Sequence, residues 1–140
     1  MDTRIAAYGV IERDGLILLS HGTEGDRGTL PGGGVEPGED PADAAVREIR
    51  EETGYTAQLG QLLGIHSFVI PAPERIHGTD ALHSIQIIYS ADIIGGTLVH
   101  ETEGSSDEAR WFDFHEVNAL QAVPHVEVGL RLWRDRSVSG

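Results

Sequence analysis

Residues 33–55 read GGVEPGEDPADAAVREIREETGY and decide the fold, because they mark both ends of one helix. Asp40 is a good N-cap residue, and Pro41 suits the first helical position, where its missing N–H costs nothing. Gly54 is typical of the left-handed residue that ends a helix. The stretch therefore predicts a helix from Pro41 to about Thr53.

This helix has an apolar stripe and a separate acidic face when its residues are placed at intervals of about 100°. The stripe is expected to face the core and consists of Ala42, Ala45, Val46, Ile49 and Thr53. The acidic face consists of Glu48, Glu51 and Glu52, which offsets of three and four residues bring together. These carboxylates repel one another, and a bound cation would cancel that repulsion. Their grouping therefore favours a role as oxygen ligands of Mg²⁺ or Mn²⁺. A solvated acidic face is the other explanation, and the helix alone does not decide between them.

Strands are predicted on both sides of this helix. Thr3–Glu12 and Leu16–Ser20 are apolar, β-branched runs joined by Asp14-Gly15, a strong hairpin signal. Further strands are predicted at Ala57–Pro71, Ser84–Ile94 and Ala109–Phe112, with a loop at Ala72–His83 and a turn at Gly95-Gly96 leading into Thr97–His100. Helices are predicted from Phe114, after Asp113 as cap, to about Ala122, with Pro124 as its end, and over Val126–Arg134. Residues 1–140 are expected to form one α+β domain.

The charge balance restricts the partners. Ten Lys and Arg against 23 Asp and Glu give a net charge of −13, so the mean field disfavours nucleic-acid polymers and anionic membrane surfaces. A phosphate substrate would need a local reversal of this field, which a bound divalent cation provides. The chain has no cysteine, which excludes disulfides and a cysteine nucleophile. No run approaches the roughly 18 to 20 apolar residues of a membrane span, so a cytoplasmic location is expected.

The charged residues and glycines follow a longer pattern. Gly33 is followed by five residues and Glu39, and then by seven residues and the run Arg47-Glu48-Ile49-Arg50-Glu51-Glu52-Thr53-Gly54. This pattern resembles the box of the Nudix hydrolase family (MutT-like), and every glycine and charged position of that box is satisfied. Tyr55 occupies the final aliphatic position and is the one departure. The Leu-Pro-Gly before the box and residues 108–112 also look like the family, so the resemblance covers nearly the whole chain.

The resemblance implies a Nudix-type α/β/α sandwich with a mixed central sheet. It also implies a metal-dependent pyrophosphohydrolase that splits a nucleoside diphosphate linked to another group (NDP-X) into NMP and P-X by attack of water on phosphorus. The cofactor would be Mg²⁺ or Mn²⁺. The substrate would be a small nucleotide diphosphate derivative, with ADP-ribose, nucleotide sugars and modified nucleoside triphosphates as candidates. Whether the chain forms a homodimer is left open. The alternative from another class is a catalytically inactive Nudix-fold module that binds nucleotides or regulates.

The resemblance also assigns roles to the residues of the box. The metal ligands would be Glu48, Glu51, Glu52 and a backbone carbonyl at Gly33 or Gly32. Arg47 would hold Glu51 in place, and Glu39 and Gly32 would be supporting residues. The catalytic set would be Glu51, Glu52, Arg47 and Glu103. The general base is left open between Glu52 and a carboxylate of the later loop, where Glu103 is preferred over Glu101, Asp107 and Glu108.

Substrate recognition is expected outside the box. Arg27 and Arg75 are cationic candidates for contacts with the substrate phosphates, and each is equally an ordinary loop residue. Pro71 stands sixteen residues beyond the box, a placement that resembles the ADP-ribose-cleaving members and that also suits the simple end of a strand. His66 and His83 lie on predicted strands and are expected to be core or edge histidines rather than ligands.

Overall fold

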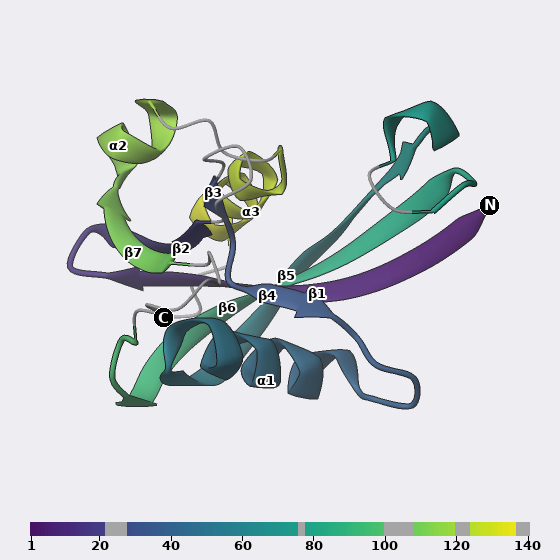
Figure 1. Cartoon of the computed structure of the whole chain (residues 1–140). Helices are drawn as coiled ribbons and strands as arrows, with labels where there is room; N and C mark the ends of the chain where they lie inside the picture. The colour runs from purple at the N-terminus through teal and green to yellow at the C-terminus, as the bar shows by residue number, and fades with distance from the viewer. Residues whose placement is uncertain (22–27, 76–77, 100–107, 120–123, 137–140) are drawn as a thin grey trace.

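The computed structural model describes residues 1–21, 28–75, 78–99, 108–119 and 124–136. In these residues the chain forms a seven-stranded mixed sheet and three α-helices (Figure 1). The strands are β1 (Asp2–Arg13), β2 (Leu16–His21), β3 (Gly28–Thr29), β4 (Gly32–Gly34), β5 (Tyr55–Ile70), β6 (Leu82–Gly96) and β7 (Glu108–Asp113). The helices are α1 (Pro41–Thr53), α2 (Phe114–Ala119) and α3 (Pro124–Arg134), with a short 3₁₀ helix η1 (Ala72–Glu74).

β1 is the strand on which the sheet is built. It pairs in parallel with β6 along one edge, and the other edge is shared by two antiparallel partners, β4 at residues 6–8 and β2 at residues 12–13. The strand order is β3-β2-β1-β6-β5, with β4 beside β1 and β7 beside β2. The predicted hairpin is confirmed, because Asp14 (φ 53°) and Gly15 (φ 82°) turn the chain between β1 and β2.

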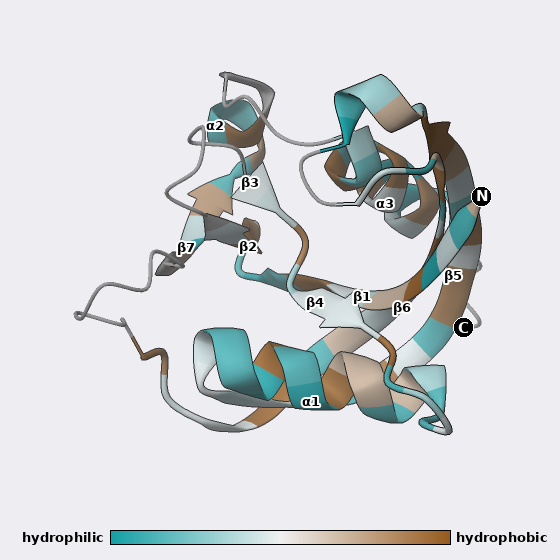
Figure 2. Ribbon diagram, turned by 45° about the vertical axis from the view of Figure 1, so that its right-hand side comes forward, coloured by the Kyte–Doolittle hydropathy of each residue, from teal (hydrophilic) through white to brown (hydrophobic). Residues whose placement is uncertain are grey.

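Both predicted ends of α1 are confirmed. The Asp40 side chain accepts a hydrogen bond from the Ala42 N–H at 2.8 Å, and Gly54 follows the helix with φ 84°. The buried residues of α1 are Ala44, Ala45, Ile49 and Thr53, whereas Ala42 and Val46 of the predicted stripe are only half-buried. Figure 2 shows the helix against one face of the sheet with polar and apolar residues alternating along it.

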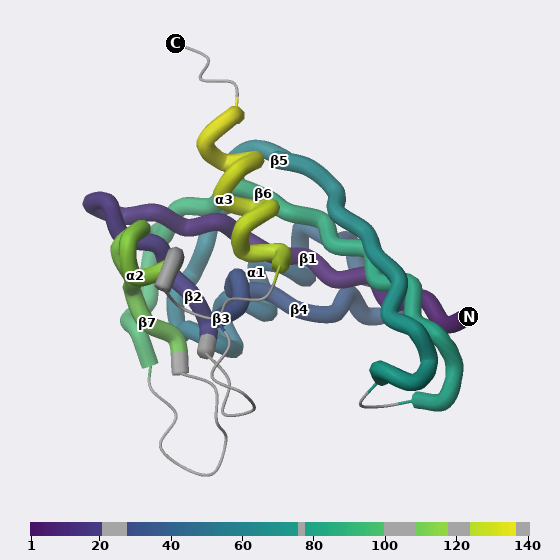
Figure 3. Tube along the Cα trace, turned by 90° about the horizontal axis from the view of Figure 1, so that it is seen from above, coloured from purple at the N-terminus to yellow at the C-terminus, as the bar shows by residue number. Residues whose placement is uncertain are grey.

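The opposite face of the sheet is covered by α3 (Figures 1 and 3). Val126 and Leu130 are buried there in one core cluster with Val10, Ile17, Ile88 and other residues. Gly129 makes the closest approach, because a Cβ at this position would lie 2.7 Å from Leu30 Cδ1 and 3.3 Å from Val10 Cγ2. The layers therefore form the α/β/α sandwich that was predicted. Among the described residues, no helix has the length and apolarity that crossing a membrane requires.

β5 is the outermost strand of the sheet beside β6. Several of its large apolar side chains face solvent, with exposed fractions of 58% for Leu62, 63% for Ile65 and 50% for Val69. The strand contains no Asp, Glu, Lys or Arg. Its outer edge thus lacks the charged residues that most proteins place on such an edge.

Three predicted details are wrong. β6 continues through Gly95 and Gly96, which pair with the start of β5, so these glycines are not a turn. Residues 97–99 consequently follow a strand rather than form a new one. Pro124 is the first residue of α3, two residues before the predicted start, because proline fits the first turn of a helix. The predicted end of the preceding helix near Ala122 lies outside the described residues.

The contact between Gly129 and the sheet predicts the effect of a larger side chain. We expect Gly129→Val to lower the free energy of unfolding by about 1–3 kcal/mol, the usual cost of overpacking a core. Arg131→Val is the matched control, since it places the same side chain on an exposed position of α3. Urea denaturation measures both variants, and equal stability would show that α3 does not depend on this close contact.

Candidate active site

Arg47 joins α1 to the chain that precedes the helix. Its Nε and Nη2 atoms donate to the two carboxylate oxygens of Glu39, both at 2.9 Å. Nη2 also donates to the Gly34 carbonyl at 3.1 Å, and Nη1 donates to Glu48 Oε1 at 2.9 Å. A planar guanidinium is suited to such paired contacts. Arg47 therefore fixes the path from β4 to α1 and the direction of the Glu48 side chain.

The charges around Arg47 are strongly coupled. Hydrogen bonds to Glu39 and then Glu48 raise the pKa of Arg47 above its ordinary value. The hydrogen bond from Arg47, followed by one from the Glu36 N–H, lowers the pKa of Glu39 to about 2. Glu51 is a looser partner, with Oε2 3.3 Å from Nη1 and its side chain 58% exposed. Arg47 thus holds Glu39 and Glu48 more closely than the predicted partner Glu51.

The glycines of β4 allow the chain to approach β1 and α1. Gly32 has φ 147°, and a Cβ there would lie 2.2 Å from the Ala7 carbonyl oxygen. Its N–H donates to Glu52 Oε2 at 3.0 Å. A Cβ on Gly33 would lie 2.7 Å from Glu48 Cδ and Oε2. The carboxylates of Glu52 and Glu48 therefore lie against two consecutive residues of β4.

This donor set has the chemistry that a hard divalent cation prefers. The Glu48 carboxylate occupies the space that a side chain on Gly33 would fill, and carboxylate oxygens are suitable ligands for Mg²⁺. In the described part of the chain, however, no three acidic or histidine side chains converge closely enough to hold an ion. Arg47 Nη1 itself lies 2.9 Å from Glu48 Oε1 and 3.3 Å from Glu51 Oε2. The assignment of these residues as metal ligands stays a prediction.

Two other predicted residues lie away from these carboxylates. Arg75 donates to Asp2 Oδ2 at 2.6 Å and to the Asp80 carbonyl at 2.8 Å. Pro71 is exposed and directly precedes η1 at the far end of β5 (Figure 1). These hydrogen bonds of Arg75 go to residues outside the box, so contacts of Arg75 and Pro71 with a substrate stay predictions. Arg27 and Glu103 lie outside the described residues.

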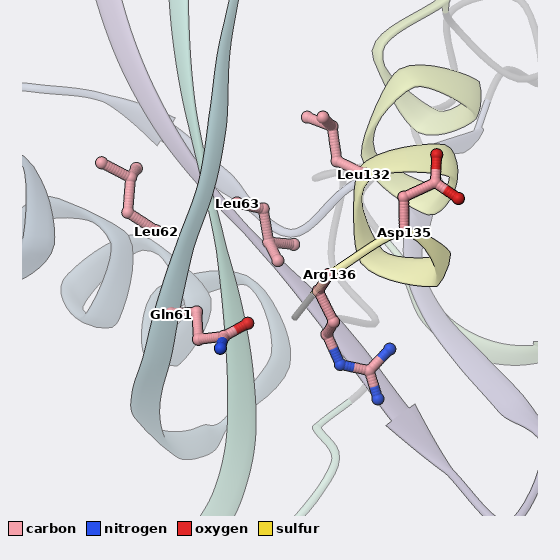
Figure 4. A pocket seen from close by; sticks show the side chains of 6 residues that line it. All are labelled: Gln61, Leu62, Leu63, Leu132, Asp135 and Arg136. Carbon is pink, nitrogen blue, oxygen red and sulfur yellow. The ribbon is translucent and has the colours of Figure 1, made fainter. Parts of the chain in front are cut away.

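A cavity of about 490 Å³ lies between β5 and the C-terminal end of α3 (Figure 4). It is lined by Gln61, Leu62, Leu63, Leu132, Asp135 and Arg136. The helix α1 lies on the opposite face of the sheet from α3 (Figure 1). This cavity is therefore not part of the site around Arg47.

The sequence analysis did not single out His125, although it contacts the loop that leads to β4. Its Nε2 atom accepts a hydrogen bond from the Leu30 N–H at 3.0 Å, and its Nδ1 atom lies 3.2 Å from Gln86 Nε2. The residue is 5% exposed. Burial, and then the charges of His66 and Arg4, lower the pKa of His125 to about 4. A histidine beside Pro124 at the start of an apolar helix was the available signal, and it does not reveal a partner 95 residues away.

Comparisons with known proteins agree with this geometry. The family model of the NUDIX domain matches residues 2–132. The ADP-ribose pyrophosphatase of Methanocaldococcus jannaschii is 38% identical over 127 residues, which cover 89% of this chain and 69% of that protein. The solved structure of a NUDIX hydrolase from Nitrosomonas europaea superposes with a TM-score of 0.80 at 22% identity, covering 95% of this chain and 89% of that one. The chain belongs to the Nudix hydrolase family.

A third relative matches over a shorter stretch. Human diphosphoinositol polyphosphate phosphohydrolase 3-alpha is 50% identical over 52 residues, which cover 37% of this chain. This chain spans about a third of that relative's length, since the match covers 32% of it.

The two glycines beside the carboxylates predict different responses to a methyl group. Gly32→Ala is expected to destabilise the fold by about 1–3 kcal/mol or more, because a positive φ is costly for alanine and its Cβ meets backbone. Gly33→Ala is expected to cost less than about 1 kcal/mol, since the far end of the flexible Glu48 side chain can move aside. Thermal unfolding followed by circular dichroism measures both. Equal destabilisation would contradict the geometry of β4.

The buried His125 predicts a pH dependence of stability. Its pKa is about 4 in the folded chain against an ordinary 6.5, so the stabilisation is complete above pH 6.5 and is lost as the pH falls from 6.5 to 4. A shift of this size corresponds to about 3 kcal/mol. We expect wild type to lose most of this amount between pH 7 and pH 4.5 in urea denaturation. His125→Gln, which cannot titrate, should show a smaller loss, and parallel pH profiles would refute the assignment.

Proposed function

We propose that the chain is a metal-dependent pyrophosphohydrolase that cleaves a nucleoside diphosphate derivative, NDP-X, into NMP and P-X. The observation that supports this most strongly is the pair of carboxylates, Glu48 and Glu52, held against the glycines of β4. Arg47 stabilises Glu48 in that position at 2.9 Å. A binding module without catalysis has no need to collect carboxylates that repel each other and also repel a phosphate ligand.

ADP-ribose is the first substrate to test. The M. jannaschii relative, named an ADP-ribose pyrophosphatase, is similar to this chain over most of both proteins. Nucleotide sugars and modified nucleoside triphosphates are the other candidates. Each carries the same phosphoric anhydride bond, so the chemistry at phosphorus is shared and the group X distinguishes them.

A divalent cation, Mg²⁺ or Mn²⁺, would be held by Glu48 and Glu52, with Glu51 and the Gly33 carbonyl as further ligands. When bound, it neutralises the charge of the diphosphate and lowers the pKa of a coordinated water. The net charge of −13 makes such local neutralisation necessary for an anionic substrate. Arg47 positions the carboxylates, and its own charge is already committed to Glu39 and Glu48.

The remaining catalytic task is to remove a proton from the attacking water. Glu52 is a candidate for this general base, because its Oε2 is oriented by the Gly32 N–H at 3.0 Å. Glu103 is the other candidate. Glu39 supports the site indirectly, since a carboxylate with a pKa near 2 remains charged and keeps Arg47 in place.

Replacement of Glu52 tests the proposal. Glu52→Gln keeps an oxygen that can accept from the Gly32 N–H but removes a negative charge. We expect kcat for the best substrate of a nucleotide panel to fall about 10³-fold, which corresponds to roughly 4 kcal/mol of transition-state stabilisation. Mg²⁺ should raise the melting temperature of wild type and raise that of the variant less.

Glu127→Gln is the matched control, because Glu127 is exposed on α3 and the same charge is removed. It should keep both the wild-type kcat and the wild-type response to Mg²⁺. If Glu52→Gln stays within about threefold of wild type, a difference of roughly 0.7 kcal/mol, Glu52 is not part of the catalytic site. Nucleotide binding without hydrolysis of any panel compound would favour the inactive module instead.

A further inference from the structure

His125 connects α3 to the backbone that receives the two carboxylates. Its Nε2 accepts the hydrogen bond of the Leu30 N–H at 3.0 Å, and Leu30 is fully buried. Two and three residues further along the chain, Gly32 and Gly33 contact Glu52 and Glu48. Pro31 joins Leu30 to Gly32, and its carbonyl accepts a hydrogen bond from the Gly9 N–H at 2.9 Å. The position of Leu30 therefore helps to set where the carboxylates lie.

The hydrogen bond from Leu30 determines where the proton of the ring resides. A ring nitrogen that accepts an N–H carries no proton, so neutral His125 has its proton on Nδ1 and donates from there. In the structure Nδ1 lies 3.2 Å from Gln86 Nε2, and Gln86 Oε1 has no hydrogen-bond partner among the described residues. Two donors cannot bond to each other, and a half turn of the amide exchanges its oxygen and nitrogen. Matching donor to acceptor therefore requires that half turn, which places the Gln86 oxygen at Nδ1.

Burial of the Gln86 amide at this position has a free-energy cost. It is 5% exposed, and in the described residues the end of its amide that faces away from His125 has no hydrogen-bond partner. A buried polar group without a partner typically costs about 1–3 kcal/mol. The contact with His125 offsets part of this cost and supports the tautomer that the Leu30 N–H requires.

The surroundings also keep the ring neutral. Burial is the main cause of the lowered pKa of His125, and the neighbouring charges of His66 and Arg4 oppose protonation as well. The Tyr8 ring packs against the imidazole with 4.5 Å between the ring centroids. At neutral pH the lone pair on Nε2 is consequently free to accept the Leu30 N–H.

We propose that His125, in the Nδ1–H tautomer that the Leu30 N–H requires and Gln86 supports, is a positioning residue that fixes the 30–33 segment and thereby Glu48 and Glu52 for hydrolysis. The proposal rests on the function proposed above. His125 acts through Leu30 and contacts neither substrate nor the reacting phosphorus. Its loss should therefore misplace the carboxylates and lower kcat, while the affinity for the nucleotide changes little.

Two substitutions separate this role from simple packing. His125→Leu removes the acceptor, and His125→Gln keeps an oxygen at about the distance of Nε2. We expect His125→Leu to lower kcat about 10²-fold, the usual effect of a misplaced catalytic group, with KM within threefold of wild type. His125→Gln should restore kcat to within about fivefold of wild type. Assays run well below the lowest melting temperature keep the variants folded.

Val126→Ala is the matched control for stability, because Val126 is buried beside His125 on α3 and takes no part in the hydrogen bond. It should lower the melting temperature and leave kcat unchanged. The proposal is overturned if His125→Leu retains the kcat of Val126→Ala, or if His125→Gln is as inactive as His125→Leu. Absence of hydrolysis by wild type on the whole panel would instead refute the proposed function.

A spectroscopic measurement tests the inference without any activity. ¹⁵N NMR of the metal-free chain at pH 7.5 distinguishes the two neutral tautomers of a histidine ring. We expect the Nδ1–H tautomer for His125. We expect Gln86→Leu, which leaves the Nδ1–H without its acceptor, to weaken this preference without reversing it, because the Leu30 N–H still requires a bare Nε2. Amide exchange at Leu30 should become faster in His125→Leu and stay slow in His125→Gln. An Nε2–H ring in wild type would be incompatible with the Leu30 hydrogen bond and would overturn the proposal even if the enzyme is active.

Discussion

The pairing of β4 with β1 brings two backbones together more closely than side chains would permit at Gly32. A Cβ on Gly32 would collide with the Ala7 carbonyl at 2.2 Å. Because the strand lies so close, its Gly32 N–H reaches Glu52, its Gly34 carbonyl reaches Arg47, and Gly33 leaves room for Glu48. The helix α1 is thereby attached to the sheet at the same residues that orient its acidic side chains. The architecture and the candidate active site therefore depend on one short strand.

The carboxylates on α1 and on the chain that precedes it share one cation, the Arg47 guanidinium. Arg47 contacts the carboxylates of Glu36, Glu39, Glu48 and Glu51 at distances from 2.9 to 3.9 Å. One guanidinium cannot neutralise four acids, so the region stays strongly negative in a chain that is already acidic. Glu39 is bound by two hydrogen bonds and Glu51 only loosely. The loosely bound carboxylates of Glu36 and Glu51 are therefore available to a further cation, in agreement with the proposed metal dependence.

Features encoded by neighbouring residues could be predicted from the sequence, and features created by distant residues could not. Asp40, Pro41 and Gly54 define α1 through local hydrogen bonds and dihedral angles, and Asp14-Gly15 defines the hairpin in the same way. The bond between Arg47 and Glu39 was not predicted, because the helical spacing pointed to Glu51, one turn further along α1, as the partner of Arg47. β4 was missed because three glycines carry no periodic signal. His125 was missed because its partners, Leu30 and Gln86, come from separate strands and loops and meet only in the folded chain.

The uncharged outer edge of β5 has a consequence for how copies of this protein behave in a crowded solution. Leu62, Ile65 and Val69 offer an apolar, open strand edge onto which another strand could add. Such an addition is opposed by the mutual repulsion of two copies that each carry a charge of −13. That repulsion acts over about 10 Å at 0.1 M salt and vanishes near the isoelectric point of about 4.7. Colloidal stability is in this way linked to the same acidic composition that makes an anionic substrate difficult to bind.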